Sequence, residues 1–249
     1  MRENLPVGHN LQDHCMAQLN ILTDEPTLFG TFTPENFALL ENGSGPLTSN
    51  IPEAGGFFRT RPELTAPDIE FHFAPSLFFD EGLTAPGEGG YCFGPVVIKP
   101  TSRGRVMLRA HLPDSKPRVL CNFLTTEEDR QSMIAGIRLA LEIAEQPALK
   151  AVVREPFSVP AADSDEDILE FVRRAAQSVY HPTSTCAMGA VVDSELRVFG
   201  AQGLRVVDAS VMPTVTRANT HAPTVMIAEK AVDLILAQTP SLALAEATG

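Results

Sequence analysis

The chain has 249 residues, of which 44% are hydrophobic and 20% charged, a composition typical of a soluble globular protein with a sizeable core. Its 31 acidic residues outnumber its 19 basic residues, and the net charge of −12 argues against nucleic acid or an anionic membrane surface as partner. No apolar run approaches the roughly 20 residues of a membrane span, and the polar N-terminus lacks the apolar core of a signal peptide. We therefore expect a cytoplasmic protein without a membrane span.

Strands are predicted in the first half of the chain. The first 65 residues are loop-rich, above all ENGSGPLTSNIPEAGG (41–56). Apolar and polar residues then alternate in DIEFHFAP (68–75), which is typical of a half-buried strand. YCFGPVVIKP (91–100), the segment after a turn at Gly104, and RVLCNFL (118–124) are further predicted strands.

Two helices are predicted to follow these strands. Thr125 and Glu128 form a capping-box pattern at the start of a helix whose apolar residues recur at helical spacing until Pro147 ends it. A second helix is predicted to begin near Ser164.

One more strand and one more helix are predicted near the C-terminus. GLRVVDAS (203–210) is a short apolar strand with an aspartate at its end, and the last helix begins at Pro223, a favourable first helical position. The order of strands, then helices, then one strand and one helix predicts an α+β fold followed by a piece of an α/β layer.

The cysteines do not predict a metal site. No CxxC pair and no histidine at zinc-ligand spacing accompanies them. Their neighbours are mostly apolar, so we expect free, buried thiols at Cys15, Cys92, Cys121 and Cys186.

Two histidines lie close to prolines. In YHPTSTCAMG (180–189), Pro182 restricts His181 to extended backbone, and in ANTHAPTVMIAEKA (218–231), His221 lies at the start of the predicted helix. An imidazole on a stiff segment is suited to act as a general base, because its unperturbed pKa lies near 6.5. The alternative for His181 is a hydrogen-bonded structural histidine.

The residues around these histidines also allow two interpretations. Asn219, Thr220 and His221 either bind an anion at the helix N-terminus or simply cap the helix. Asp208 is either a ligand-site residue at a strand end or a turn aspartate. A metal-dependent hydrolase built on His181 and His221 is disfavoured, since no acidic ligand lies at a suitable spacing.

Several motifs occur in an order that resembles a known family. They are VGHNLQDH (7–14), EAGGFFRT (53–60), SRGRVML (102–108), YHPTSTCAMG (180–189) and the long segment from VVDSELRVFG to EKAVDLI (191–235). Together they resemble the C-terminal half of the glucose–methanol–choline (GMC) flavoprotein oxidoreductases, especially the choline-dehydrogenase-like branch. The resemblance extends over nearly the whole chain, to about residue 236.

The resemblance implies a domain organisation. Residues 15–190 would form an antiparallel-sheet substrate domain backed by helices. Residues 1–14 would be an edge segment of an FAD-binding α/β domain, 191–238 its C-terminal strand and helix, and 239–249 a tail.

The resemblance also implies residue roles. His181 matches the histidine proposed to take the substrate hydroxyl proton, and His221 falls where the family has asparagine or histidine bonded to the same oxygen. Asp208 matches an aspartate near the ribityl chain of FAD. Further residues implied to line the cofactor are Ala209, Asn219, Thr220, Pro223, Thr224 and Val225, the last two through backbone facing the pyrimidine edge of the flavin.

By this resemblance the chain takes part in FAD-dependent oxidation of an alcohol to an aldehyde or ketone, by hydride transfer to the flavin. It departs from the family because it has no strand–G-x-G-x-x-G–helix segment to hold the FAD pyrophosphate. We therefore expect an incomplete FAD site, a small alcohol as substrate, and a separate N-terminal FAD-binding half as partner. The alternative is a non-catalytic remnant, a folded substrate-type domain without cofactor.

Overall fold

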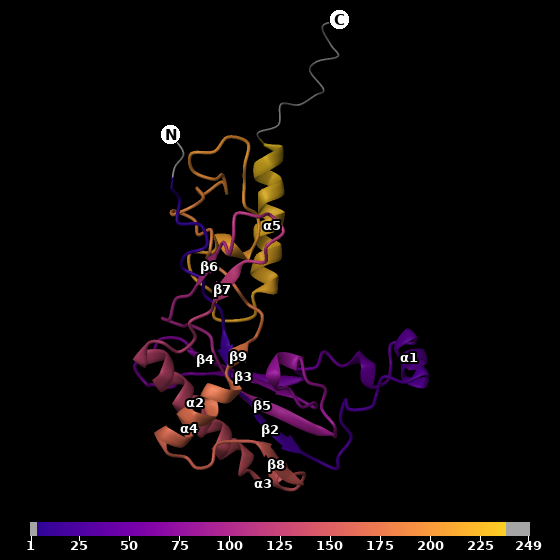
Figure 1. Ribbon diagram of the computed structural model, residues 1–249. Helices are drawn as coiled ribbons and strands as arrows, with labels where there is room; N and C mark the ends of the chain where they lie inside the picture. The colour runs from indigo at the N-terminus through magenta and orange to yellow at the C-terminus, as the bar shows by residue number, and fades with distance from the viewer. Residues whose placement is uncertain (1–3, 238–249) are drawn as a thin grey trace, which may run out of the picture. The chain divides into compact units, whose positions relative to one another are not determined.

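The computed structural model describes residues 4–237, which form parts of two compact units (Figure 1). Among the described residues, unit 1 is made of residues 4–12, 103–121 and 181–237, and unit 2 of Asp13–Ser102 and Asn122–Tyr180. The boundaries at 102/103, 121/122 and 180/181 differ from the predicted domain limits, because residues 103–121 and 181–190 group with the C-terminal segment. The roles assigned to the predicted domains stay a prediction, and the expected tail at 239–249 lies outside the described residues.

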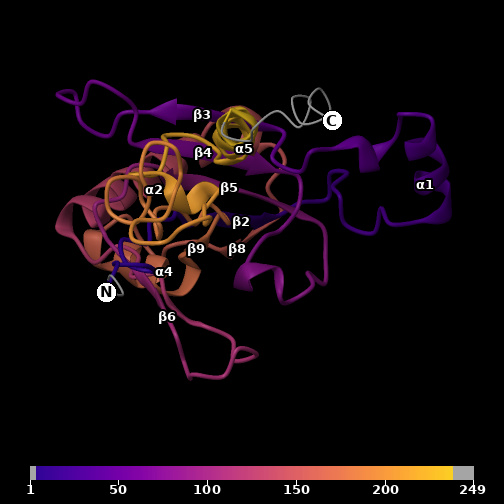
Figure 2. The same ribbon diagram turned by 90° about the horizontal axis from the view of Figure 1, so that it is seen from above.

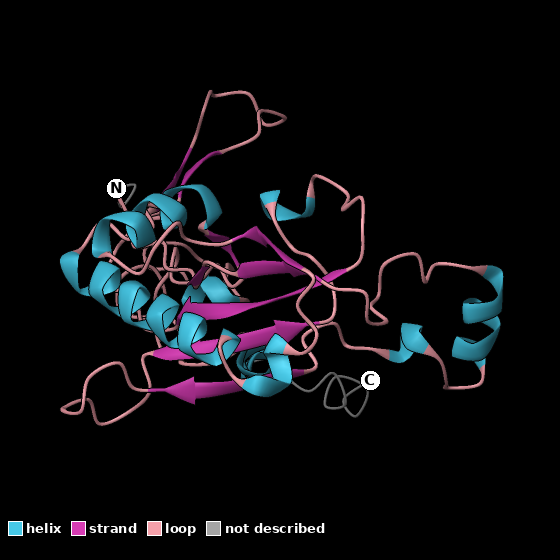
Figure 3. Ribbon diagram, turned by 90° about the horizontal axis from the view of Figure 1, so that it is seen from below, coloured by secondary structure: helices cyan, strands magenta, loops and turns pink. Residues whose placement is uncertain are grey.

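Unit 2 is built on a seven-stranded antiparallel sheet (Figures 1 and 3). Its central strand, β5 (Gly90–Val97), pairs with β4 (Ile69–Ala74) on one side and with both β1 (Cys15–Met16) and β2 (Leu19–Leu22) on the other. Beyond these strands lie β3 (Ala54–Phe58) next to β4, β8 (Glu155–Ser158) next to β2, and β9 (Gln177–Ser178) next to β1.

The sequence predicted β4 and β5 correctly but not β2 and β3, which fall in the stretch expected to be loop-rich. All four residues of β2 are buried, and Leu19 and Ile21 alternate with Gln18 and Asn20 over too short a stretch to have predicted a strand. β3 contains two glycines, which weaken the local preference for a strand, and only pairing with β4 defines it.

Helices α2 (Glu127–Ala144) and α4 (Asp165–Ala175) cover one face of this sheet, and the short α3 (Pro147–Lys150) follows α2 (Figure 3). α4 begins next to Ser164 as predicted, and the Ser164 side chain caps it. The cap of α2 is Thr126, one residue after the predicted Thr125, because the Thr126 hydroxyl accepts the Asp129 amide at 3.4 Å. α2 ends before Pro147, which instead begins α3.

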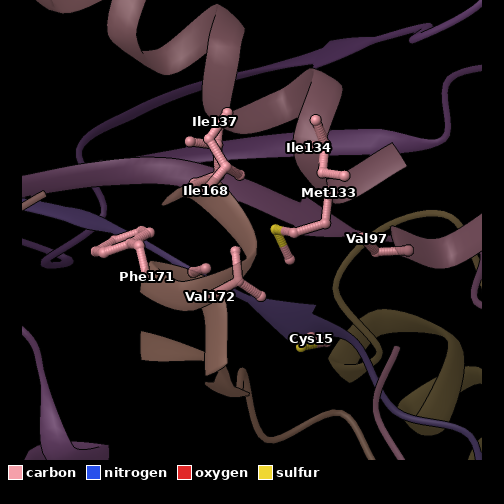
Figure 4. Packing of buried hydrophobic residues seen from close by; sticks show 9 residues of the cluster. Cys15, Val97, Met133, Ile134, Ile137, Ile168, Phe171 and Val172 are labelled. Carbon is pink, nitrogen blue, oxygen red and sulfur yellow. The ribbon is translucent and has the colours of Figure 1, made fainter. Parts of the chain in front are cut away.

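Apolar side chains from both helices meet the sheet in the core of unit 2 (Figure 4). Gly136 permits this close packing, since a Cβ there would lie 2.5 Å from both the Pro95 Cβ and the Ile69 Cδ1. The core residues seen in Figure 4 include Cys15, Val97, Met133, Ile134, Ile137, Ile168, Phe171 and Val172.

Helix α1 (Pro34–Glu41) lies away from the sheet in all three ribbon views (Figures 1–3). It contains no buried residue. Unit 2 also contains two 3₁₀ turns, η1 (Pro46–Thr48) and η2 (Asp80–Gly82).

Unit 1 contains the two-stranded ribbon of β6 (Arg105–Met107) and β7 (Arg118–Leu120), the 3₁₀ turn η3 (Ala209–Val211) and helix α5 (His221–Leu236). The predicted strand at 203–210 is wrong, since Arg205 makes only an isolated bridge with Arg197. A strand requires a ladder of backbone partners, which the described residues do not offer there. α5 begins two residues before Pro223, because Thr220 already occupies the cap position.

No described helix is both long enough and apolar enough to cross a bilayer. Residues 4–237 contain no cluster of three or more His, Cys, Asp or Glu side chains that could hold a metal ion. All four cysteines are free thiols; Cys15 and Cys92 are buried, whereas Cys121 and Cys186 are only half-buried, contrary to the expectation for them.

Candidate active site

Three segments that the sequence singled out lie together in unit 1. The segment after His181 pairs with the N-terminal motif, since Gln12 and Thr183 exchange backbone hydrogen bonds of 3.2 and 2.8 Å. The Gly8 amide also donates to the Thr185 carbonyl at 2.9 Å. Backbone pairs from residues far apart in sequence therefore fix the YHPTSTCAMG motif.

The same motif runs beside the η3 turn. The amides of Cys186 and Met188 donate to the carbonyls of Ser210 and Val211, each at 2.9 Å. The Ser184 amide reaches the carbonyl of Ala209, a predicted cofactor residue, at 3.4 Å. The structure thus brings the His181 motif next to the segment that begins at Asp208.

The buried side chain of Gln12, 2% exposed, links this arrangement to the chain before α5. Its amide nitrogen donates to the Pro213 carbonyl at 3.4 Å, and its amide oxygen accepts the Val215 amide at 3.3 Å. Gln12 belongs to the VGHNLQDH motif but was not predicted as a site residue. Its role could not be inferred locally, because its partners lie about 200 residues away in sequence.

His181 itself is half-buried and follows a strained backbone position. Tyr180 and Ser184 both have positive φ values, 62° and 73°, a region that residues with a Cβ rarely adopt. Strain of this kind occurs where surrounding contacts fix the backbone, and it is frequent at functional sites.

The Asp208 side chain is exposed and caps η3, accepting the Ser210 amide at 2.8 Å. Asp208 therefore acts as a turn aspartate, one of the two roles that the sequence allowed for it. A role near a cofactor stays a prediction for Asp208.

The N-terminus of α5 is only partly capped. Thr220 is the cap residue and is buried, but its side chain makes no capping hydrogen bond. Its carbonyl accepts both the amide and the hydroxyl of Thr224, at 3.0 and 2.6 Å. His221 and Val225 are exposed in the first turns, and Asn219 is exposed just before them. Amide groups of a first helical turn lack partners within the helix, and they favour negative charge.

Unit 2 contains a further group of polar residues that the sequence analysis did not assign to a site. Ile69, Phe71 and Phe73 contribute to the core under α2, so the intervening Glu70 and His72 lie on the opposite face of β4. We call this opposite side the polar sheet face. It also includes the buried side chains of Gln18, Asn20 and Gln177. The alternation in DIEFHFAP predicted a half-buried strand, but it did not mark His72 or Glu70 as a site residue.

A cavity of about 90 Å³ adjoins the polar sheet face within unit 2. Two side-chain amides of this face hold the loop that contains η2. The Asn20 side-chain oxygen accepts the Phe78 backbone amide at 2.8 Å, and the Gln177 side-chain oxygen accepts the Glu81 backbone amide at 2.7 Å. The cavity is lined by Gln18, Asn20, Phe78, Phe79, Asp80, Ser158, Phe171, Arg174, Ala175 and Gln177.

This mixed α/β fold is found in flavoprotein oxidoreductases. It matches formate oxidase of Aspergillus oryzae, in a structure concerned with FAD modification, with a TM-score of 0.83 at 26% identity, over 94% of this chain and 48% of that one. Residues 100–228 match the sequence model of the GMC oxidoreductases.

Sequence relatives agree with this match. The chain is 42% identical over 246 residues to an oxygen-dependent choline dehydrogenase of Pseudomonas fluorescens, covering 94% of this chain and 43% of the relative. It is 39% identical over 242 residues to an alcohol dehydrogenase [acceptor] of Pseudomonas putida, covering 92% of this chain and 44% of the relative. The chain belongs to the GMC oxidoreductase family, and it spans less than half the length of these curated relatives.

Proposed function

We propose that this chain provides the catalytic histidines of an FAD-dependent enzyme that oxidises an alcohol to an aldehyde or ketone. The observation that carries the proposal is the fixation of the His181 motif by backbone pairs to Gln12 and to residues 209–211. A base held in this way is positioned before the substrate arrives, which can contribute several kcal/mol to lowering a barrier. The names of the choline and alcohol dehydrogenase relatives support the reaction class.

In this proposal the His181 imidazole accepts the proton of the substrate hydroxyl. His221, on the first turn of α5, hydrogen-bonds the same oxygen and favours the alkoxide that forms. Loss of the hydroxyl proton to His181 and of a hydride from the carbon leaves a carbonyl group, so two electrons depart with the hydride.

The residues at the start of α5 fit a flavin. Asn219, Thr220, His221, Pro223, Thr224 and Val225 surround a helix N-terminus whose cap side chain makes no hydrogen bond to the first turn, and Asp208 and Ala209 lie at η3. Bound FAD supplies the hydride acceptor. A helix N-terminus stabilises negative charge at the site it faces, which is the charge that a reduced flavin carries.

We also propose that FAD binding needs additional polypeptide. The sequence has no G-x-G-x-x-G turn between a strand and a helix, the usual cradle for the pyrophosphate. A separate or covalently linked N-terminal FAD-binding half is the expected partner.

The first experiment is an absorbance spectrum of the purified chain, alone and after mixing with the N-terminal half of the Pseudomonas putida relative in the presence of FAD. We expect little bound flavin for the chain alone and a flavin spectrum for the mixture. A stoichiometric flavin spectrum from the chain alone would refute the need for a partner.

The second experiment measures anaerobic flavin reduction by alcohol in the reconstituted enzyme. His181→Ala should slow reduction by about 100- to 10,000-fold, the usual contribution of a positioned base. His221→Asn should be milder, because asparagine can still hydrogen-bond the alcohol oxygen, and Asp208→Ala should mainly weaken FAD retention. The matched control is His111→Ala, which removes an exposed histidine of the same unit. If His181→Ala and His111→Ala reduced flavin equally fast, the base assignment would be wrong.

A further inference from the structure

Ser178, the last residue of β9, connects a buried carboxylate to the backbone just before His181. Its hydroxyl donates to Oδ2 of Asp13 at 2.5 Å, and the same hydroxyl oxygen accepts the Tyr180 amide at 2.7 Å. Asp13 is 7% exposed and Ser178 is half-buried, which strengthens both hydrogen bonds relative to bonds in water. A serine hydroxyl has one proton, so the bond to Asp13 fixes the direction in which its oxygen accepts.

Tyr180 has a strained backbone that this bond supports. Its φ of 62° lies in the left-handed region, which a residue with a large side chain rarely adopts unless surrounding contacts impose it. The Tyr180 hydroxyl also donates to the Glu81 carbonyl at 3.0 Å, but the residue as a whole is 60% exposed. The bond to Ser178 acts on the backbone, and it fixes the peptide plane that precedes the strained turn.

The strained turn lies in a bulge that contains His181. Before the turn, Ser178 pairs with Cys15 within unit 2, and after it, Thr183 pairs with Gln12 within unit 1. Between these two pairs the chain has four residues on the His181 side and two on the other. Additional residues of this kind redirect a side chain and are frequent next to active sites. The direction of the His181 side chain therefore depends on the backbone of the residue before it.

We propose that Ser178 is a positioning residue for the His181 base and acts through the Tyr180 backbone. The inference rests on the proposed alcohol oxidation, in which His181 accepts the proton of the substrate hydroxyl. The Asp13 carboxylate orients the Ser178 hydroxyl, the hydroxyl oxygen holds the Tyr180 amide, and the left-handed turn directs the imidazole that follows. Ser178 itself takes no part in the proton transfer. Because misplacing a reacting group by about 1 Å can slow a reaction 100-fold, loss of the hydroxyl should affect the chemical step.

The first test measures anaerobic flavin reduction in the full chain reconstituted with FAD and the N-terminal half of the Pseudomonas putida relative. The substrate is whichever of choline and a panel of primary alcohols reduces the parent fastest. Ser178→Ala should lower the limiting rate by roughly 10- to 100-fold and leave the half-saturating concentration of the alcohol nearly unchanged. Ser178→Thr keeps the hydroxyl and should restore most of the rate.

The matched control for this test is Ser132→Ala. The Ser132 hydroxyl, on α2, donates to Oδ2 of the buried Asp68 at 2.8 Å, which is the same kind of bond within the same unit. Its loss should lower stability in urea unfolding without changing the limiting rate, so the control separates general destabilisation from misplacement of the base. Should Ser178→Ala fail to fold, Ser178→Cys takes its place, since a thiol is a weaker donor and acceptor than a hydroxyl.

The second test needs no flavin. In the full chain labelled with ¹⁵N, hydrogen exchange of the Tyr180 amide reports how often its bond to Ser178 opens. Ser178→Ala should speed this exchange by roughly tenfold or more, as expected when one hydrogen bond is lost, and should shift the His181 imidazole signals. Ser178→Thr and Ser132→Ala should do neither.

Two results would overturn the inference. One is a parental limiting rate for Ser178→Ala beside a slow His181→Ala. The other is an equal loss of rate in Ser178→Ala and Ser132→Ala, which would show that reduced stability explains both. A parental rate for His181→Ala, or a parent that no alcohol reduces, would instead overturn the proposed function. Exchange of the Tyr180 amide would then still decide whether Ser178 fixes the turn.

Discussion

Removing the Asp129 carboxylate should destabilise unit 2 and change its response to acid. Asp129 lies in the first turn of α2 and is almost fully buried. Its Oδ1 accepts the Thr101 amide and hydroxyl at 2.8 and 2.9 Å, and its Oδ2 accepts the Ser102 amide at 2.8 Å. The Ser102 hydroxyl in turn accepts the amides of Thr125 and Thr126 at 2.9 and 3.2 Å. This cluster ties together the points at which the chain leaves unit 2 and returns to it.

The expected loss of stability follows from the hydrogen-bond donors that Asp129→Ala would leave without an acceptor. Asp129→Ala removes the acceptor of the buried Ser102 amide and of the Thr101 amide, which is exposed enough to be rehydrated. An unpaired buried donor costs about 1–3 kcal/mol, so we expect a loss of about 3 kcal/mol in the free energy of unfolding. Because the chain has no tryptophan, urea unfolding followed by circular dichroism is the appropriate measurement. The exposed Glu127, in the same helical turn, is the matched control as Glu127→Ala, and its effect should be clearly smaller.

The pH dependence provides a second measurement. Burial is the largest single influence and raises the pKa of the Asp129 carboxyl, but the hydrogen bonds from Ser102 and Thr101 together outweigh it and hold the pKa below its ordinary value. A lowered folded-state pKa means that the contribution is present above the unfolded pKa of about 3.9 and is lost as pH falls through the folded value. Asp129→Asn should lack this acid-dependent loss. If Asp129→Asn matched the parent in stability at neutral pH and in its acid response, the hydrogen bonds accepted by the Asp129 carboxylate would contribute nothing to the stability of unit 2.

Three further predictions concern unit 2. Tyr91→Phe should leave stability unchanged or raise it by about 1 kcal/mol in urea unfolding, because the buried Tyr91 hydroxyl has no partner among the described residues, while its ring still stacks on Phe73 and Phe93; a clear loss would reveal a hidden partner. Gly136→Ala should lower stability by about 1–3 kcal/mol, since its Cβ would lie 2.5 Å from that of Pro95, and unchanged unfolding would show that α2 can shift without cost. Burial raises the pKa of the Cys92 thiol to about 12, so iodoacetamide at mildly alkaline pH should modify Cys92 only after unfolding. Mass spectrometry of peptides measures this labelling, and rapid labelling of Cys92 in the native chain would contradict its burial.

Local patterns in the sequence determined several elements of this protein. Alternation specified β4, the Ser164 cap specified the start of α4, and motif order identified the family before any fold was known. These signals succeeded because each depends on side chains within a few residues of one another, where helical or strand periodicity acts directly. The predicted start of α2 was wrong by one residue. Thr125 and Thr126 are chemically similar cap candidates, and a local pattern does not distinguish them.

Only the tertiary structure decided the rest. The strand expected at 203–210 does not form, because a strand depends on backbone partners that no local pattern reports. Gln12 became a link to Pro213 and Val215 through contacts between residues about 200 positions apart. The unpaired oxygen of Glu70 is visible only once pairing of β3, β4 and β5 fixes the face on which it lies and places the apolar Phe57 and Val96 beside it. Satisfaction of a buried polar atom is a property of its three-dimensional surroundings, and the sequence around it does not contain them.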